Sequence, residues 1–353
     1  MSLSIPLQKA LSLREKGALF IDARSPAEFA EATIPGAVNV PLLDDQERCR
    51  VGTLYKQEGK QAARQLGVRL VSGKIPSFVD QVISAKQPGS PPVVVFCWRG
   101  GMRSRAMTQF LDLAGIPARQ LQGGHKSFRK HVREYFESGT WGRLVVLRGM
   151  TGVGKTVLLH RLREDGTPVI DLEGLASHRG SAFGNLGLAE QPSQKMFESL
   201  LWDQLRLLGE EGYAVTEGES RHIGRLVQPP RFFETLQREV SIWINAPLRV
   251  RVENILEDYP VRSELKESFR VPLRALKERL GKETVAELEE LLEDGCWSEL
   301  VRELMVRYYD PLYRHTLPEQ RIEVEIQDVR GDLRPLKDAI AEVLARNLVG
   351  QGQ

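Results

Sequence analysis

The chain has 353 residues, of which 41% are hydrophobic, and this length predicts two domains of ordinary size. The formal net charge of +2 excludes a uniformly basic or acidic protein. The three cysteines, Cys49, Cys97 and Cys296, are too few and too widely spaced for a disulfide framework. No stretch reaches the roughly 18 consecutive apolar residues of a membrane span, so we expect a cytoplasmic protein that does not enter a membrane.

The first part of the chain alternates strands with helices. Apolar runs predict strands at residues 18–24, 92–97 and 118–124. Helical spacing that ends at a glycine predicts a helix at residues 104–115. A stretch rich in Gly, Ser and Thr at residues 136–143 interrupts this alternation, so we expect one domain at 1–137 and a second at 138–353.

The second part repeats the alternation. Its predicted strands are residues 143–149, 167–173, 213–219, 240–246 and 321–327. Residues 274–307 are predicted to be mostly helical, and residues 333–348 form an amphipathic helix. The expected fold class is therefore α/β, with two domains built on mainly parallel sheets and a helical C-terminal region.

The sequence Phe96–Arg105, "FCWRGGMRSR", places Cys97 between a buried strand and a helix N-terminus. Backbone amides at such a junction form an anion-binding nest. Two glycines and three arginines follow within eight residues, namely Gly100, Gly101, Arg99, Arg103 and Arg105. Nearby positive charge favours the thiolate over the thiol. We therefore predict that Cys97 is reactive and that Arg99 and Arg103 hold an oxyanion beside its sulfur.

Residues 21–41, "IDARSPAEFAEATIPGAVNVP", together with the Cys97 loop resemble the rhodanese family. The resemblance implies a cysteine that carries sulfur as a persulfide or selenium as a perselenide, with Asp22, Arg24 and Glu28 as scaffold. Thr33 stands where the family often has His, and a long insert precedes the cysteine strand. The spacing Cys-x5-Arg also fits phosphatases and leaves room for a tetrahedral oxyanion. The loop alone therefore leaves both chalcogen transfer and phosphate-ester chemistry open.

The sequence Gly149–Thr156, "GMTGVGKT", matches the phosphate-binding pattern G-x-x-x-x-G-K-[ST] between a predicted strand and a helix. The residues expected to cradle a pyrophosphate are Gly149, Thr151, Gly152, Gly154, Lys155 and Thr156. Thr156 is also the predicted ligand of a Mg²⁺ ion. Its acidic partner is predicted to be Glu217, and the strand at residues 167–173 offers Asp171 and Glu173 as alternatives. We expect no tightly bound cofactor.

The combination of these loops with "DLEGLASHRGSAFG" (171–184) and "ESRHIG" (219–224) resembles the bacterial tRNA 2-selenouridine synthases from about Leu7 to about Asp332. The resemblance implies a transferase that acts on tRNA carrying 2-thiouridine at the wobble position and replaces the sulfur with selenium from selenophosphate. It also implies geranyl diphosphate as a co-substrate, an S-geranyl intermediate, and a selenophosphate-producing enzyme as a partner. In this interpretation Lys155 and the P-loop hold the departing pyrophosphate, and the Cys97 loop presents selenium.

A tRNA substrate requires a basic surface. The predicted contacts are Lys126, Arg129, Lys130, Arg133, Arg179, Arg221 and Arg225. Three other functions remain open on single motifs. The P-loop also fits an ATP-dependent kinase fused to a sulfurtransferase, the Cys97 loop also fits a Cys-x5-Arg phosphatase, and a binding module would use both loops without turnover.

Overall fold

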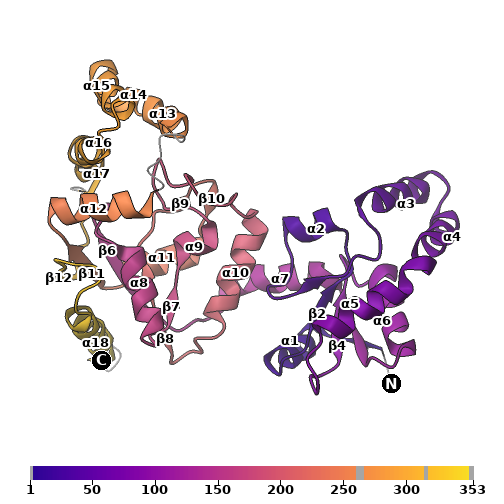
Figure 1. Ribbon diagram of the computed structural model, residues 1–353. Coiled ribbons are helices and arrows are strands. Elements are labelled where there is room, and N and C mark those ends of the chain that lie inside the picture. Colours follow the sequence, from indigo (N-terminus) through magenta and orange to yellow (C-terminus); the bar gives the residue numbers. More distant parts are fainter. Residues whose placement is uncertain (1–2, 260–265, 314–316, 350–353) are drawn as a thin grey trace. The chain divides into compact units, whose positions relative to one another are not determined.

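The computed structural model describes residues 3–259, 266–313 and 317–349 (Figure 1). The chain divides into two compact units, one comprising Met1–Gly139 and Pro192–Asp203, the other Thr140–Gln191 and Gln204–Gln353. The predicted domain ranges did not include the return of Pro192–Asp203 to the first unit. Within the part of the chain that is described, no helix has the length and apolar character needed to cross a membrane.

The first unit contains a parallel five-stranded sheet with the order β1-β5-β4-β2-β3. Its strands are β1 (Ser4–Ile5), β2 (Phe20–Asp22), β3 (Val38–Asn39), β4 (Val93–Phe96) and β5 (Ala118–Leu121). Its helices are α1 (Leu7–Glu15), α2 (Pro26–Glu31), α3 (Asp45–Gln57), α4 (Lys60–Val71), the 3₁₀ turn η1 (Ser72–Lys74), α5 (Ile75–Ala85), α6 (Met102–Leu113) and α7 (Gly124–Ser138), joined by α10 (Gln194–Leu205). The long insert before the cysteine strand therefore folds as α3, α4 and α5.

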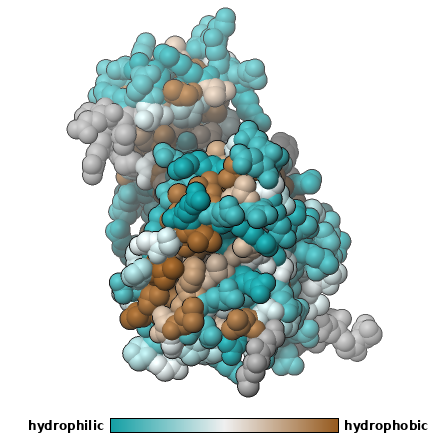
Figure 2. All heavy atoms as spheres, turned by 90° about the vertical axis from the view of Figure 1, so that its right-hand side faces the viewer, coloured by the Kyte–Doolittle hydropathy of each residue, from teal (hydrophilic) through white to brown (hydrophobic). Residues whose placement is uncertain are grey.

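The central strands of this sheet are buried on both faces, as expected for a parallel sheet covered by helices. All four residues of β4 are buried, and apolar side chains of α5 and α6 pack against them. Asp22 and Arg24 form a buried ion pair at 2.6 Å, and the Thr33 hydroxyl donates to Asp22 at 2.9 Å. These residues are therefore part of the scaffold. Figure 2 shows one face of the molecule, on which hydrophilic residues predominate around a band of hydrophobic ones.

The second unit has a parallel sheet with the order β12-β11-β6-β8-β7 and a two-stranded antiparallel ribbon of β9 and β10. The strands are β6 (Arg143–Gly149), β7 (Val169–Ile170), β8 (Tyr213–Glu217), β9 (His222–Ile223), β10 (Leu226–Val227), β11 (Ser241–Asn245) and β12 (Arg321–Glu325). The helices are α8 (Lys155–Glu164), α9 (Leu172–Ala176), α11 (Pro230–Arg238), α12 (Leu248–Asp258), α13 (Lys266–Ala275), α14 (Lys277–Leu280), α15 (Lys282–Glu293), α16 (Trp297–Leu304), a π-helical turn η3 (Met305–Tyr309), α17 (Asp310–Tyr313) and α18 (Arg334–Val349).

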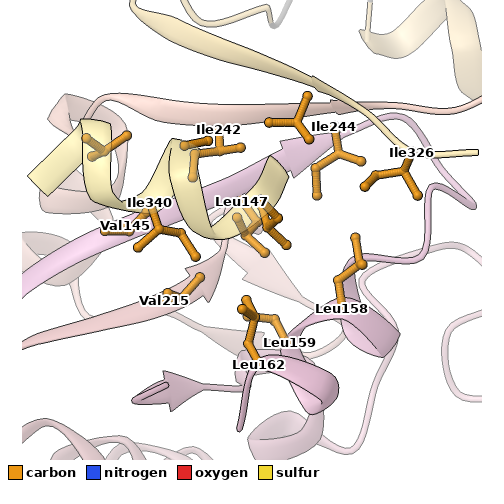
Figure 3. Close-up of a cluster of buried hydrophobic side chains, with 14 of the residues drawn as sticks. Val145, Leu147, Leu158, Leu159, Leu162, Val215, Ile242, Ile244, Ile326 and Ile340 are labelled. Carbon is orange, nitrogen blue, oxygen red and sulfur yellow. The ribbon is translucent and has the colours of Figure 1, made fainter. Parts of the chain in front are cut away.

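The core of the second unit lies between its sheet and helices α8 and α18. Figure 3 shows side chains of β6, β8 and β11 meeting those of both helices, among them Leu147, Val215, Ile242, Leu159 and Ile340. A smaller apolar cluster packs α13, α15 and α16 together. Figure 1 shows where these helices lie in the ribbon. The expected α/β fold class with two mainly parallel sheets and a helical C-terminal region is thereby confirmed.

Candidate active site

The P-loop connects β6 to α8 and depends on two glycines. Gly152 and Gly154 have φ of +81° and +82°, a region that favours glycine. A Cβ atom would lie 2.6 Å from the Arg251 carbonyl oxygen at Gly152, and 2.4 Å from a Val329 methyl at Gly154. The Arg251 Nε also donates to the Thr151 carbonyl at 2.8 Å. The loop is therefore held in one conformation by both its own backbone and its neighbours.

The acidic residue in contact with the P-loop is Glu173. Thr156 Oγ1 donates to Glu173 Oε2 at 2.9 Å, and the Glu173 amide donates to Glu217 Oε1 at 2.7 Å. Glu217 is 1% exposed, lies behind Glu173, and has a second oxygen without a hydrogen-bond partner. Asp171 accepts from the Gly174 amide at 2.7 Å, as the N-cap of α9, and lies 2.8 Å from His160. The structure thus places Glu173, one of the two alternatives from residues 167–173, beside Thr156 instead of the preferred Glu217.

Three carboxylates, those of Glu173, Glu217 and Glu219, interact with Lys155 at this site. Burial raises the pKa of Glu173 to about 8, and Glu219 adds to the effect. Burial, together with Asp171 and Glu173, also raises the pKa of Glu217 well above its ordinary value. Burial opposes the charge on Lys155, but Tyr313 and the nearby carboxylates raise its pKa overall. Lys155 is therefore positively charged, and each neighbouring carboxylate makes it harder for the others to lose a proton.

Oxygen ligands for a divalent cation are present here, although too few for a site made by protein alone. The Thr156 hydroxyl and the carboxylates of Glu173 and Glu219 line one cavity. Among the described residues, no three His, Cys, Asp or Glu side chains are grouped so that they could hold a metal ion by themselves. Mg²⁺ usually binds through one or two carboxylates together with substrate phosphates. These residues therefore fit a Mg²⁺ ion that arrives with a diphosphate.

The P-loop opens into a cavity of about 1050 Å³ within the second unit. We call it the phosphate cavity, and its walls include Gly149, Thr151, Gly152, Gly154, Lys155, Thr156, Glu173, Glu219, Tyr259, Tyr309 and Tyr313. Arg179 and Arg221 also line it. Arg179 donates to the carbonyl oxygens of Leu186 and Asp258, at 2.8 and 2.7 Å, and lies 4.6 Å from the centre of the Tyr259 ring. The cavity can hold a ligand much larger than a diphosphate alone.

The second loop holds Cys97 at the carboxyl end of β4. Its side chain is 3% exposed. The Gly101 amide donates to Cys97 Sγ at 3.2 Å, and Ser104 Oγ lies 3.2 Å from the same sulfur. The loop therefore curls around the sulfur and leaves little of it exposed.

The predicted arginines lie in different surroundings. Arg103 forms a bidentate pair with Glu28, in which NH2 donates to Oε1 at 3.2 Å and NH1 donates to Oε2. Although burial raises it, the pKa of Glu28 lies below its ordinary value because Arg103 donates to the carboxylate. Arg99 is exposed. The predicted contact of either guanidinium with an oxyanion remains a prediction.

The turn at Gly123–His125 packs against the Cys97 loop, and this contact was not predicted from the sequence. At Gly124, a Cβ atom would lie 2.0 Å from the Cys97 carbonyl oxygen and 2.4 Å from the Gly100 amide nitrogen. The His125 amide donates to the Cys97 carbonyl at 2.8 Å. Burial, together with Arg24 and Arg129, lowers the pKa of His125 to about 3. The His125 side chain is therefore uncharged near neutral pH. The two glycines that precede it, Gly123 and Gly124, were the sequence feature that could have indicated this turn.

The predicted tRNA contacts divide by burial. Lys126, Lys130 and Arg133 are exposed on α7 at helical spacing, on one side of the helix. Arg129 is buried and donates to the Lys195 carbonyl at 2.9 Å and to Ser199 Oγ at 3.0 Å. It therefore fixes α10 to α7. Arg221 and Arg225 are exposed, and Arg225 pairs with Glu190 at 3.2 Å.

A rhodanese-like domain and a P-loop domain, each with its loop at the carboxyl end of a parallel strand, define the class of protein. The model of the rhodanese-like domain matches residues 7–131, and that of the tRNA 2-selenouridine synthase AAA domain matches residues 142–345. The chain belongs to the tRNA 2-selenouridine synthase family, which confirms the resemblance inferred from its motifs.

Relatives of that name align over most of their length. The protein of Bdellovibrio bacteriovorus is 36% identical, with 88% of this chain and 92% of the relative covered. That of Nitrosomonas europaea is 34% identical, with 86% and 90% covered, and that of Cupriavidus pinatubonensis is 34% identical, with 94% and 96% covered.

Proposed function

We propose that this protein is a transferase that replaces the sulfur of wobble 2-thiouridine in tRNA with selenium, through an S-geranyl intermediate. The observation that carries the proposal is the pairing of two anion-binding loops of different size in a chain of this family. The P-loop opens into a cavity of about 1050 Å³, which suits a diphosphate with an organic group. The Cys97 loop closes around a sulfur atom, which suits a small anion such as selenophosphate.

The first step transfers the geranyl group. A lone pair of the thiouridine sulfur attacks C1 of geranyl diphosphate, and the C1–O bond breaks with its electron pair leaving on the diphosphate. The proton on N3 of the base is released to solvent. Lys155 and the loop amides stabilise the charge on the departing oxygen. They are already in position before the reaction begins, so the loop does not have to reorganise. A Mg²⁺ ion held by Thr156 and Glu173 supplies further positive charge when it is bound.

The second step exchanges the chalcogen. The selenium of selenophosphate attacks C2 of the base, and geranylthiolate leaves with the electron pair of the C–S bond and takes a proton from water. Water then cleaves the Se–P bond and yields phosphate and 2-selenouridine. Alkylation favours this exchange because it converts a doubly bonded sulfur into a group that can leave as a thiol.

Cys97 has a positioning role in this scheme. The transfer of selenium to the Cys97 sulfur as a perselenide would require an oxidant, because selenophosphate holds selenium at the selenide level. The Gly101 amide, 3.2 Å from Cys97 Sγ, lies where it can also donate to a bound anion. We therefore assign the loop the task of holding selenophosphate with its selenium directed at C2.

The exposed side of α7 supplies a surface for tRNA beside this loop. The Lys126 amide donates to the Trp98 carbonyl of the Cys97 loop at 2.8 Å, so Lys126 begins the basic stripe at the loop itself. Lys130 and Arg133 continue it. Phosphate contacts of this kind give affinity without base specificity.

Reconstitution with purified components tests the proposal. The protein is incubated with 2-thiouridine tRNA and Mg²⁺, together with geranyl diphosphate, selenophosphate, both, or neither, and the digested nucleosides are weighed by mass spectrometry. We expect S-geranyl-2-thiouridine with geranyl diphosphate alone and 2-selenouridine only with both. Matched tRNA with an unmodified wobble uridine should not react. Rapid ATP hydrolysis without a change in the nucleosides would instead favour the fused kinase.

A further inference from the structure

A second, apolar cavity adjoins the phosphate cavity within the second unit. Its volume is about 60 Å³. Five residues line both cavities, namely Thr151, Ser181, Ile255, Tyr259 and Tyr309. Because Thr151 belongs to the P-loop, the junction between the two cavities lies directly beside the phosphate-binding backbone.

The part of the apolar cavity beyond this junction is made by the C-terminal helices. Its walls come from α12, α13, α16 and η3 and include Leu256, Phe269, Leu273, Trp297, Leu300, Val301, Leu304 and Met305. The rings of Phe269 and Trp297 meet edge to face, with centroids 5.2 Å apart. No charged side chain is among the lining residues that the structure describes. A ligand group that enters here must therefore be apolar.

The junction itself combines polar and apolar surfaces. The hydroxyls of Ser181 and Tyr259 lie 3.0 Å apart, and Thr151 Oγ1 donates to the Tyr313 hydroxyl at 3.4 Å. Tyrosine offers an apolar ring and a polar tip, and so suits a boundary between the two kinds of surface. Tyr309 reaches the junction from the π-helical turn η3, and such turns are frequent at functional sites. The junction therefore suits a molecule that is charged at one end and apolar at the other.

We propose that the apolar cavity holds the end of the hydrocarbon tail of an allylic diphosphate whose phosphates lie on the P-loop, and that it selects the length of that tail. This inference rests on the proposed function. The first isoprene unit lies at the junction, where both cavities share their walls. The second unit extends into the apolar cavity between α13 and α16.

The small volume of the cavity is the reason for selection by length. An apolar cavity of about 150 Å³ accepts benzene, so a second isoprene unit fits into about 60 Å³ only if side chains move. Met305 stands in the wall and is of a flexible, unbranched type that repacks easily. A third isoprene unit meets packed side chains of the apolar cluster around Leu300 and Leu304. The site therefore favours a ten-carbon tail over five or fifteen carbons.

Isothermal titration of the full chain in Mg²⁺ tests this inference with inorganic pyrophosphate and with dimethylallyl, geranyl and farnesyl diphosphates. Wild-type protein should bind geranyl diphosphate at least tenfold more tightly than pyrophosphate or either of the other two. Val301→Phe fills the cavity and should remove this gain, while pyrophosphate binding changes less than twofold. Val306→Phe is the matched control, because Val306 lies nearby in η3, is 48% exposed and lines neither cavity.

An enlarged cavity supplies the opposite test. Leu300→Ala should raise the affinity for farnesyl diphosphate relative to geranyl diphosphate at least tenfold, and thermal unfolding establishes that the variant is folded. Equal binding of pyrophosphate and geranyl diphosphate by wild-type protein, or equal effects of Val301→Phe and Val306→Phe, would overturn the tail site and leave the diphosphate site intact. Failure of pyrophosphate itself to bind would instead refute the proposed function of the P-loop.

Discussion

The Cys97 loop and the P-loop occupy equivalent positions in their sheets but have different surroundings. Each joins the carboxyl end of a parallel strand to a helix, and each contains at least one glycine at which a Cβ atom would not fit. The P-loop faces a large cavity, whereas the Cys97 side chain is almost completely buried. Under the proposed function, these similar loops would therefore take ligands of very different size.

The charges around the two loops also differ. The P-loop lysine interacts with three carboxylates, those of Glu173, Glu217 and Glu219, so we expect a cation to accompany a bound diphosphate. The Cys97 loop carries Arg99, Arg103 and Arg105, and Glu28 balances Arg103. We therefore expect an anion to bind the Cys97 loop without a metal ion, and a diphosphate to bind the P-loop together with Mg²⁺.

The largest expected effect separates the two loops by reaction. Lys155→Ala should lower geranylation about 10³-fold, because it removes a preorganised charge from the leaving group. Cys97→Ala should leave geranylation within about twofold and lower conversion of S-geranyl tRNA to the selenium product about 10³-fold. Single-turnover assays of each step, with purified S-geranyl tRNA for the second, measure both values. Loss of both reactions in both variants would contradict a division of labour between the loops.

Backbone space under the Cys97 loop gives the next effect. Gly124→Ala places a methyl group 2.0 Å from the Cys97 carbonyl oxygen at a φ of +57°, and should cost about 2–4 kcal/mol of stability and most of the selenium exchange. Gly115→Ala is the control, because its φ of +78° carries the same conformational penalty with open space around it, and it should cost about 1 kcal/mol. Urea unfolding, monitored by fluorescence, compares the free energies of unfolding of the two variants. Equal losses would mean that the turn does not support the loop.

Much of the fold could be predicted because its strands are short apolar runs buried on both faces. All eight predicted strands are present, although most are shorter than expected. Strand β7, for example, comprises only Val169–Ile170, because Asp171 caps α9 and ends the strand. Strands β1 and β3 have two residues each and show no periodicity to detect.

The site was predictable only where one segment carries it. Cys97 and the P-loop residues lie in continuous motifs whose spacing has a chemical reason. Glu173 was an alternative to Glu217, and the sequence could not decide between them because the start of α9 at Leu172 determines which side chain reaches Thr156. Tyr259 and Tyr309 come from α12 and η3, far along the chain, and only tertiary packing brings them to the P-loop.

The burial of Glu173, together with the neighbouring Glu219, predicts a pH effect on stability. Glu173 has an ordinary pKa of 4.5 in the unfolded chain and about 8 in the folded one. The folded protein therefore retains a proton that the unfolded chain releases, so its extra stability is complete below pH 4.5 and is lost as the pH rises through 8. Glu173→Gln should unfold at higher urea than wild type at pH 9 but not at pH 5, by roughly 1–3 kcal/mol, in metal-free buffer. Glu164→Gln, at an exposed position on α8, should show no such difference.

The smallest expected effect concerns the basic side of α7 beside the Cys97 loop. Lys126→Ala should lower the slope of log affinity for tRNA against log salt by about 0.7–0.9, without a change in stability, because one phosphate contact is removed. Arg129→Ala, three residues away, should leave the slope unchanged and reduce stability by about 3 kcal/mol, because it removes the ion pair with Glu198 and the hydrogen bonds that join α7 to α10. Filter binding across a salt series and urea unfolding measure the two quantities. A reduced salt slope in Arg129→Ala with unaltered stability would reverse these assignments and place the RNA contact inside the α7–α10 interface.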